Sequence, residues 1–374
     1  MKKLVIFTVA LSVAFQAFAA SVVPFGSVDY VEGNAIIVRS GKSLGEANIG
    51  DSILPDDMIK TASDGLVIIA LDKSTGMRGT LTVKQKSVAY IRLAPGTAGP
   101  KSTIDLIAGQ IGSKLAKISG SPSLQVQTDS VVMGVRGTAF SMASSVNGSV
   151  LVVCTEGAVA CTDGGEPLTV DAGKAVEKKA SERLRLVPVA ISSPEQFEQR
   201  WISDEIEAFR SNAVRALGDF EKRYTEQLVR FNEAFAPLQK SEILSKWIRE
   251  DAAGLVPYPN DATVLKEKKA LSADILATRK VLFIFERIYY RIMQLDQLVM
   301  GTTLERQNIR PGYSAGDFIR KVRTDAAGLE RRMFLFRYAE KLYELRNTGG
   351  AGMPGMSGSG SDDDFFSSTE DWDF

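Results

Sequence analysis

The 374-residue chain contains no histidine. Histidine is the general base of Ser-His-Asp and Cys-His sites and a ligand in most catalytic zinc sites, so its absence excludes these classes of enzyme. Catalysis would have to use carboxylate, lysine or tyrosine side chains, and no carboxylate pair stands out among the 45 acidic residues. We therefore expect a protein that is not an enzyme and that binds no metal or cofactor.

An excess of charge is also lacking, since 45 basic residues balance the 45 acidic ones. Nucleic-acid binding normally requires a clustered basic surface, so we expect no nucleic-acid partner. Beyond the N-terminus, no stretch is apolar enough to span a membrane.

The N-terminus has the pattern of a secretion signal. Two lysines precede an apolar run over residues 4–15, and residues 17–19 supply a small-x-small cleavage site. The run is too short to cross about 30 Å of hydrocarbon comfortably. We expect residues 1–20 to be a signal peptide cleaved near Ala19 or Ala20, which makes the mature protein periplasmic or secreted and not membrane-spanning.

Cysteine is scarce, and the two cysteines, Cys154 and Cys161, fall within one predicted hairpin. In an oxidising compartment a disulfide between facing strands is plausible. Two buried, apolar free thiols fit the sequence equally well, because free cysteine is among the most buried residue types. The sequence leaves both alternatives open.

Residues 21–187 predict an all-β domain of the sandwich or roll type. Short β-branched runs alternate there with Gly, Asp, Asn and Ser, which is the pattern of strands separated by turns. The predicted strands are Ala35–Arg39, Leu66–Leu71, Gly79–Val83, Val88–Leu93, Ser102–Ala108, Leu124–Gln127, Thr138–Met142, Ser149–Thr155 and Leu168–Val170.

Residues 188–194 predict a linker, and residues 195–348 predict long helices. Apolar residues recur there three or four apart, which indicates a first helix of about 40 residues and a second over Asp261–Gln307. Ser314 and Asp317 have the spacing of a capping box that opens a third helix. We expect a multidomain α+β protein whose helices form a bundle or coiled coil, either within one chain or as a homo-oligomer.

Residues 349–374 predict a disordered tail, Gly/Ser-rich at first and then acidic and aromatic. A solvating tail is one interpretation. The alternative is a partner-binding segment, because disordered segments can bind through aromatic anchors. The candidate anchors are Phe365, Phe366, Trp372 and Phe374.

Several motifs over residues 26–178 follow one another in an order that resembles the FecR-type periplasmic domain. They are Ile49-Gly50-Asp51, Gly109-Gln110-Ile111, Gly134-Val135-Arg136-Gly137-Thr138 and Glu156-Gly157-Ala158. We expect Gly134 and Gly137 to adopt backbone angles that a Cβ would obstruct, at a bend before the strand that Thr138 begins. Arg136 is expected to pin this bend to its neighbours; the alternative is that it grips an anionic ligand.

The resemblance implies a periplasmic β module that makes protein or envelope-polymer contacts. Transducers of this family carry a cytoplasmic segment and a membrane span before the domain, whereas here the predicted signal peptide leads almost directly into it. We therefore expect an exported binding or scaffold protein whose partner is an envelope protein or a cell-wall polymer. The alternatives are a soluble sensor that passes a ligand signal to a membrane partner and, with the least support, a carboxylate-based hydrolase.

Overall fold

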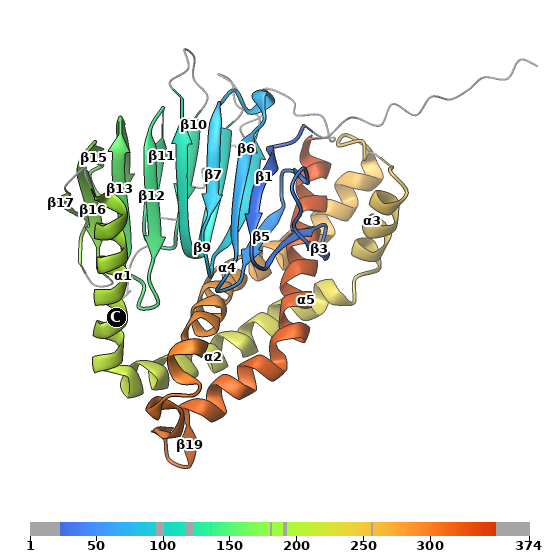
Figure 1. Ribbon diagram of the computed structural model, residues 1–374. Helices are drawn as coiled ribbons and strands as arrows, with labels where there is room; N and C mark the ends of the chain where they lie inside the picture. The colour runs from blue at the N-terminus through green and yellow to red at the C-terminus, as the bar shows by residue number, and fades with distance from the viewer. Residues whose placement is uncertain are drawn as a thin grey trace, which may run out of the picture.

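The computed structural model describes residues 23–94, 101–116, 123–135, 137–179, 182–189, 193–255 and 257–348. The predicted signal peptide, Arg136 and the predicted tail anchors Phe365, Phe366, Trp372 and Phe374 lie outside these residues. Within them a β-rich part precedes a helical part (Figure 1), so the predicted fold class is confirmed.

The strands form two layers that share one long strand, β9 (Lys101–Leu115). In the order of their pairing, the first layer consists of β4 (Ser52–Ile53), β1 (Gly26–Glu32), β6 (Leu66–Leu71), β7 (Gly79–Val83), β9, β12 (Ala139–Ser144), β13 (Val150–Glu156), β16 (Lys174–Lys178) and β17 (Arg185–Pro188). The second layer consists of β3 (Lys42–Glu46), β2 (Ala35–Arg39), β5 (Met58–Thr61), β8 (Val88–Ala94), β9, β10 (Ser123–Gln127), β11 (Val132–Val135), β14 (Ala158–Thr162) and β15 (Leu168–Asp171).

Gly109 is the point at which β9 passes from one layer to the other. Residues 101–108 pair with β8 in the second layer, and residues 109–114 pair with β12 in the first. Gly109 has φ +90°, and a Cβ there would lie 2.3 Å from Ser87 Oγ and 2.5 Å from the Lys86 carbonyl oxygen. Only glycine fits this bend, because both the backbone angle and the space exclude a side chain.

The two layers enclose one apolar core. Because side chains alternate along a strand, the other side chains of the second layer point outward, toward the helices. In β8, Ala89 and Ile91 point into the core between the layers, whereas Val88 and Tyr90 point outward to a second core under the helices. Strands that are buried on both faces read as nearly continuous apolar runs. This explains why the sequence predicted β8 so clearly.

The helical part contains α1 (Pro194–Ser211), α2 (Ala213–Gln239), α3 (Glu242–Ala252), α4 (Ala262–Val299) and α5 (Ala315–Thr348). The short elements among the described residues are the 3₁₀ turns η1 (Lys73–Thr75) and η2 (Thr303–Arg306) and the hairpin of β18 (Asn308–Arg310) and β19 (Tyr313–Ser314).

The prediction of a single first helix of about 40 residues is wrong, because breaks at Asn212 and Ser241 divide it into α1, α2 and α3. Ser241 caps α3, since its Oγ accepts a bond of 3.1 Å from the Leu244 backbone N–H. The predicted capping box is confirmed: Asp317 N–H donates to Ser314 Oγ (3.1 Å) and Ser314 N–H donates to Asp317 Oδ2 (3.0 Å).

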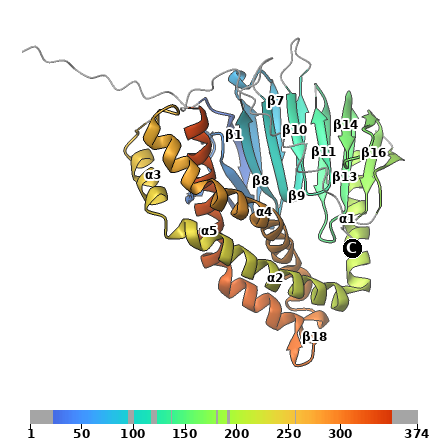
Figure 2. The ribbon, with the colours of Figure 1, turned by 180° about the vertical axis from the view of Figure 1, so that it is seen from behind.

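The helices pack back onto the β part. Tyr290 of α4 and Phe334 of α5 belong to the same apolar cluster as Met58 and Tyr90 of the second layer. At the far end of the first layer, Trp201 of α1 packs on β13 and β16. Figure 2 shows α4 lying beside β8 and β9, whereas α2 and the first part of α5 extend below the β part. Among the described helices, none is both long and apolar enough to cross a bilayer.

Candidate functional site: the open face of the first layer

The outer face of the first layer is covered by α1 at one end only. A row of directly paired residues runs across it through Tyr30, Ile68, Thr82, Gly112, Ser141, Val153 and Ala175. Val153 and Ala175 are buried under α1 together with Trp201. Among the described residues no helix lies over β1, β6 and β7, as Figure 1 shows. We call this uncovered part, on β1, β6, β7 and β9, the open face.

Along the open face this row contains only uncharged residues. Tyr30 is 44% exposed, while Ile68, Thr82 and Gly112 are half-buried. A parallel row of paired residues contains Ser27, Ala70, Thr80 and Lys114. Solvent-facing sides of antiparallel sheets are usually polar, so isoleucine, alanine and glycine at these positions favour contact with another molecule.

Two glycines offer a direct way to probe this face. The nearest atom to a Cβ built on Gly112 is the Phe140 carbonyl oxygen at 3.7 Å, so a side chain fits there without strain and would stand on the open face. Gly134 lies on the outer side of the second layer, and a Cβ there would meet nothing within 4 Å. Because it also accepts a side chain without strain, it serves as the control position for Gly112.

The outer face of the second layer is held by a charged seam. We define the seam as Arg92, Asp105 and Asp129 on the β side and Glu286, Arg287, Arg291 and Arg337 on α4 and α5. Most of its arginines have a carboxylate partner: Arg92 with Asp105 at 2.8 Å, Arg291 with Asp129 at 2.7 Å, and Arg337 with Glu286. Arg337 also lies 4.8 Å from the ring centre of Tyr90. Burial alone would lower the pKa of Arg337, but Glu286 and Glu340 raise it above its usual value.

Arg287 has no carboxylate at bonding distance within the described part of the chain, although it is only 3% exposed. Its Nη1 donates to the Phe283 carbonyl oxygen at 3.0 Å, while Nε and Nη2 have no partner among the described residues. Burial lowers the pKa of Arg287, and Asp105 and Asp129 offset this only in part. The seam therefore holds one buried cation that is not directly paired.

The predicted motif lies where the chain crosses from β11 in the second layer to β12 in the first. Gly137 has φ +62°, as expected for a bend, and the buried Thr138 accepts a bond of 2.9 Å from Leu115 N–H at the end of β9. The backbone requirement expected for Gly134 is wrong, because this residue lies within β11 and has space for a Cβ. Arg136 lies outside the described residues, so both of its proposed roles stay predictions.

Cys154 and Cys161 are buried free thiols in the structure. Burial raises the pKa of both, and it raises that of Cys161 to about 12 with a smaller contribution from Cys154. Within the described residues, no group of three or more His, Cys, Asp or Glu side chains is placed to hold a metal ion. The cysteines lie in the apolar core and do not contribute to the open face.

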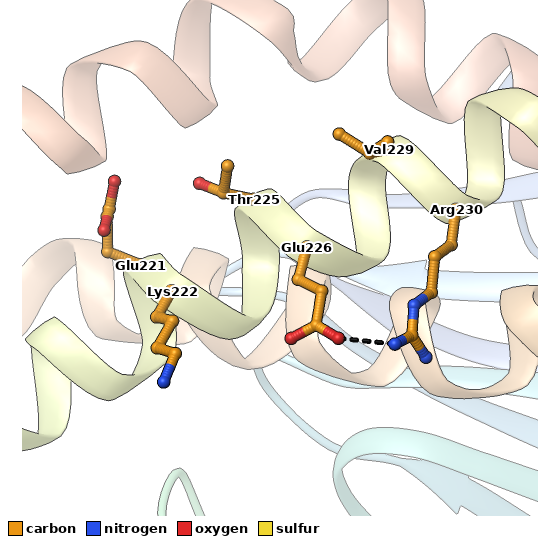
Figure 3. A pocket seen from close by; sticks show the side chains of 6 residues that line it. All are labelled: Glu221, Lys222, Thr225, Glu226, Val229 and Arg230. Atoms are coloured by element: carbon orange, nitrogen blue, oxygen red, sulfur yellow. Dashed lines mark hydrogen bonds and ion pairs between the residues drawn. The ribbon is translucent and has the colours of Figure 1, made fainter.

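A surface hollow of about 520 Å³ lies on α2 (Figure 3). All six of its lining residues come from this one helix, and Glu226 and Arg230 among them already form an ion pair at 2.6 Å. An exposed pair of this kind contributes little binding energy. We therefore regard the open face as the stronger candidate site.

Comparison with known proteins confirms the family resemblance over part of the chain. Residues 57–160 match the family model described as FecR protein, a shorter segment than the expected 26–178. This segment contains the motif and the parts of the open face on β6, β7 and β9. No curated protein matches the chain.

Two crystal structures of a candidate anti-sigma factor from Parabacteroides distasonis are similar to the chain at low level. They have 10% and 11% sequence identity and TM-scores of 0.32 and 0.24. The alignments cover 38% and 36% of this chain, and 64% and 55% of the respective structures. The chain thus spans less than two thirds of their length.

Proposed function

We propose that this chain, whose residues 57–160 match the FecR family, is an exported binding module that acts through protein contacts and catalyses no reaction. The observation that carries the proposal is the open face. Its half-buried Ile68, Ala70 and Gly112 lie on an uncovered side of the sheet within the matched segment. Apolar sheet faces are suited to packing against another protein surface.

A protein partner fits this face better than a cell-wall polymer does. Glycan sites normally offer several aromatic platforms and converging polar side chains, whereas Tyr30 is the only aromatic residue in the two rows described above. The small side chains of Ala70, Thr80 and Thr82, and the absence of one at Gly112, would let a protein surface approach closely.

Export is supported by the two N-terminal lysines, the apolar run over residues 4–15 and the small residues at 17–19. The test is N-terminal sequencing of the protein recovered from the periplasmic fraction and the medium. We expect it to begin at Ala20 or Ser21. Recovery of only the unprocessed chain from the cytosol would contradict the proposal.

The binding experiment uses two matched glycine variants. Gly112→Arg places a long side chain on the open face, and Gly134→Arg places the same side chain on the other layer, at sites where a Cβ meets no atom closer than 3.7 Å. A photo-crosslinking amino acid at Thr82 then captures the partner from envelope extract.

With the crosslinker at Thr82 and no other change, we expect one discrete crosslinked partner protein. The same product should form in the Gly134→Arg variant and should be lost in the Gly112→Arg variant. Both variants should melt within a few degrees of the parent, because neither side chain meets a close contact. Crosslinking that survives Gly112→Arg, or equal capture of purified sacculi through the open face, would refute a protein-binding role for this face.

A sensor is the second candidate function, and Arg287 is the observation that favours it. An anionic ligand that paired with this buried guanidinium would change how α4 packs on the second layer. The test is thermal unfolding with inorganic phosphate or small dicarboxylates, compared with chloride at equal ionic strength. Stabilisation that is saturable in the parent and absent in Arg287→Met would support this function, and equal responses would exclude it.

The predicted homo-oligomer remains a prediction that light scattering of the mature protein can test. The apolar stripes of α2, α4 and α5 pack together within one chain: Phe231 and Phe285 stack at 5.2 Å, and Phe235 meets Phe336 edge-on at 6.5 Å. These stripes are therefore used in the intramolecular core and would not supply an interface between copies.

A further inference from the structure

The first half of α4 carries an exposed face of lysines and leucines. We define this lysine face as Leu265, Lys266, Lys269, Leu276 and Lys280. At 100° per residue these five side chains fall within a sector of about 100°, opposite to the side that buries Leu271 and Ile275. Leu265 is 49% exposed and Leu276 is 51% exposed, which is unusual for leucines on a well-packed helix.

The lysine face is positively charged without local compensation. The carboxylates of this half of α4, Glu267 and Asp274, project from the opposite side by the same helical geometry. Glu267 is already bonded to Lys246 at 2.6 Å and to Trp247 Nε1 at 2.7 Å. Within the described part of the chain, none of the three lysines of the face forms an ion pair with another residue. Exposed leucines flanked by free lysines fit a ligand that is both acidic and apolar.

The last described residues of α5 lie beside this half of α4. Tyr343 has the ammonium of Lys268 5.7 Å from its ring centre, and Arg279 of α4 pairs with Glu344 at 3.0 Å. Arg346 reaches α3, where it pairs with Glu250 at 2.7 Å. Figure 1 shows α3, the start of α4 and the end of α5 at the same end of the molecule. The chain after Thr348 therefore starts next to the lysine face.

The sequence after Thr348 has the complementary chemistry. Residues 349–374 contain no lysine or arginine, and they carry acidic residues at 362, 363, 364, 370, 371 and 373 next to Phe365, Phe366, Trp372 and Phe374. Thirteen Gly/Ser-rich residues, 349–361, come first. A flexible linker of this length spans roughly 20 Å, and Leu265 to Lys280 measures about 22 Å along the helix.

We propose that Asp362–Phe374 binds the lysine face of its own chain. Phe365 and Phe366 pack on the exposed leucines, and the flanking carboxylates pair with the three lysines. A linker this short gives the tethered segment an effective concentration in the millimolar range, so that even weak binding keeps the face occupied. The tail then acts as a built-in competitor for other acidic, aromatic ligands. This inference does not depend on the open face or its partner.

The test uses a fluorescent peptide of residues 361–374 and two forms of the chain, complete and ended after Ser361. Both forms retain every helix and strand described above, and circular dichroism checks that they melt alike. We expect saturable binding to the shortened chain that weakens as salt rises, because exposed charges are screened. The complete chain should bind the peptide at least 10-fold more weakly, since its own tail competes.

Matched substitutions by glutamate locate the site. Lys269→Glu and Leu276→Glu lie on the lysine face and should each weaken peptide binding at least 5-fold, whereas Lys222→Glu on the exposed side of α2 should not change it. In the complete chain, hydrogen exchange over residues 262–280 should slow relative to the shortened chain. Exchange reports opening of the backbone, which a bound segment opposes.

The proposal is overturned if the shortened chain does not bind the peptide, or if Lys222→Glu weakens binding as much as Lys269→Glu does. Equal peptide affinity for the complete and shortened chains would show that the tail does not occupy the face. Dimerisation of the complete chain that is lost on shortening would place the tail on a second copy instead, and this too would overturn binding within one chain.

Discussion

Replacing Arg337 by methionine should strongly destabilise the protein, because it leaves a buried carboxylate without its partner. Glu286 is fully buried, and its Oε2 accepts a hydrogen bond from Arg337 Nη2. Breaking a buried ion pair by removing one partner costs about 3–5 kcal/mol. Methionine keeps part of the apolar stem, so most of the loss comes from the charge of Glu286.

Arg287→Met is the control for this variant, since it removes a guanidinium that is even more buried, from the neighbouring helix α4. Among the residues that the structure describes, Arg287 has no bonded carboxylate and its Nε and Nη2 are unpaired. Its removal leaves no carboxylate stranded, so we expect a loss below about 1 kcal/mol or a gain in stability. Two arginines of the same seam, Arg337 on α5 and Arg287 on α4, should thus differ in that only the loss of Arg337 is costly.

The assay is urea unfolding followed by far-ultraviolet circular dichroism and by tryptophan fluorescence, with the unfolding free energy taken from the linear dependence on urea. The double variant Arg337→Met/Glu286→Leu should recover much of the loss, because it removes both charges. A cost below about 1 kcal/mol for Arg337→Met, or similar costs for Arg337→Met and Arg287→Met, would refute this account of the seam.

Three further predictions concern the β core and the start of α5. Gly109→Ala should cost at least about 3 kcal/mol by urea unfolding, because it combines a left-handed backbone with a Cβ 2.3 Å from Ser87 Oγ; a smaller loss would contradict the assigned bend. Cys154 and Cys161 should resist iodoacetamide at pH 8 in the folded protein and react in urea, because burial raises the pKa of each thiol; thiols that react in urea only after reduction would indicate a disulfide instead. The pKa of Asp317 is lowered to about 2 by the Ser314 backbone N–H and hydroxyl, below the ordinary 3.8. The Asp317 carboxylate therefore contributes to the free energy of unfolding above pH 4, and this contribution is lost as the pH falls toward 2. Over that range Asp317→Asn should lose less stability than the parent. Parallel curves of stability against pH for the two proteins would argue against this.

The sequence predicted those strands and helices whose own residues carry the pattern. Strands such as β8 and β13 are buried on both faces and form clear apolar runs. By contrast, β3 has five exposed residues, Lys42–Glu46, and β5 is only Met58–Thr61, so neither offers a run or an alternation long enough to detect. The break at Asn212 was missed because the apolar period continues through it into α2.

The candidate site depends on tertiary packing that periodicity does not encode. Of the strand segments of the open face, β6 and β7 were predicted, whereas β1 and the second half of β9 were not. Whether Ile68 and Thr82 face solvent depends on which layer the helices cover. That choice is made by contacts between distant residues, such as Lys60 with Glu330 at 2.6 Å. The segment that matches the family contains the motif around Gly137. The resemblance carried no signal for Arg287 or for the lysine face, which lie outside the matched segment.

The passage of β9 through both layers ties their folding together. A slip of one residue in β9 would turn Ile104 out of the core in one layer and Ile111 out of it in the other, because side chains alternate along a strand. The strands that pair with β9 cannot complete their hydrogen bonding until β9 is in place. Neither layer can therefore fold completely without the other. We expect the β part to unfold as one cooperative unit, and cleavage of the backbone near Gly109 to abolish both layers together.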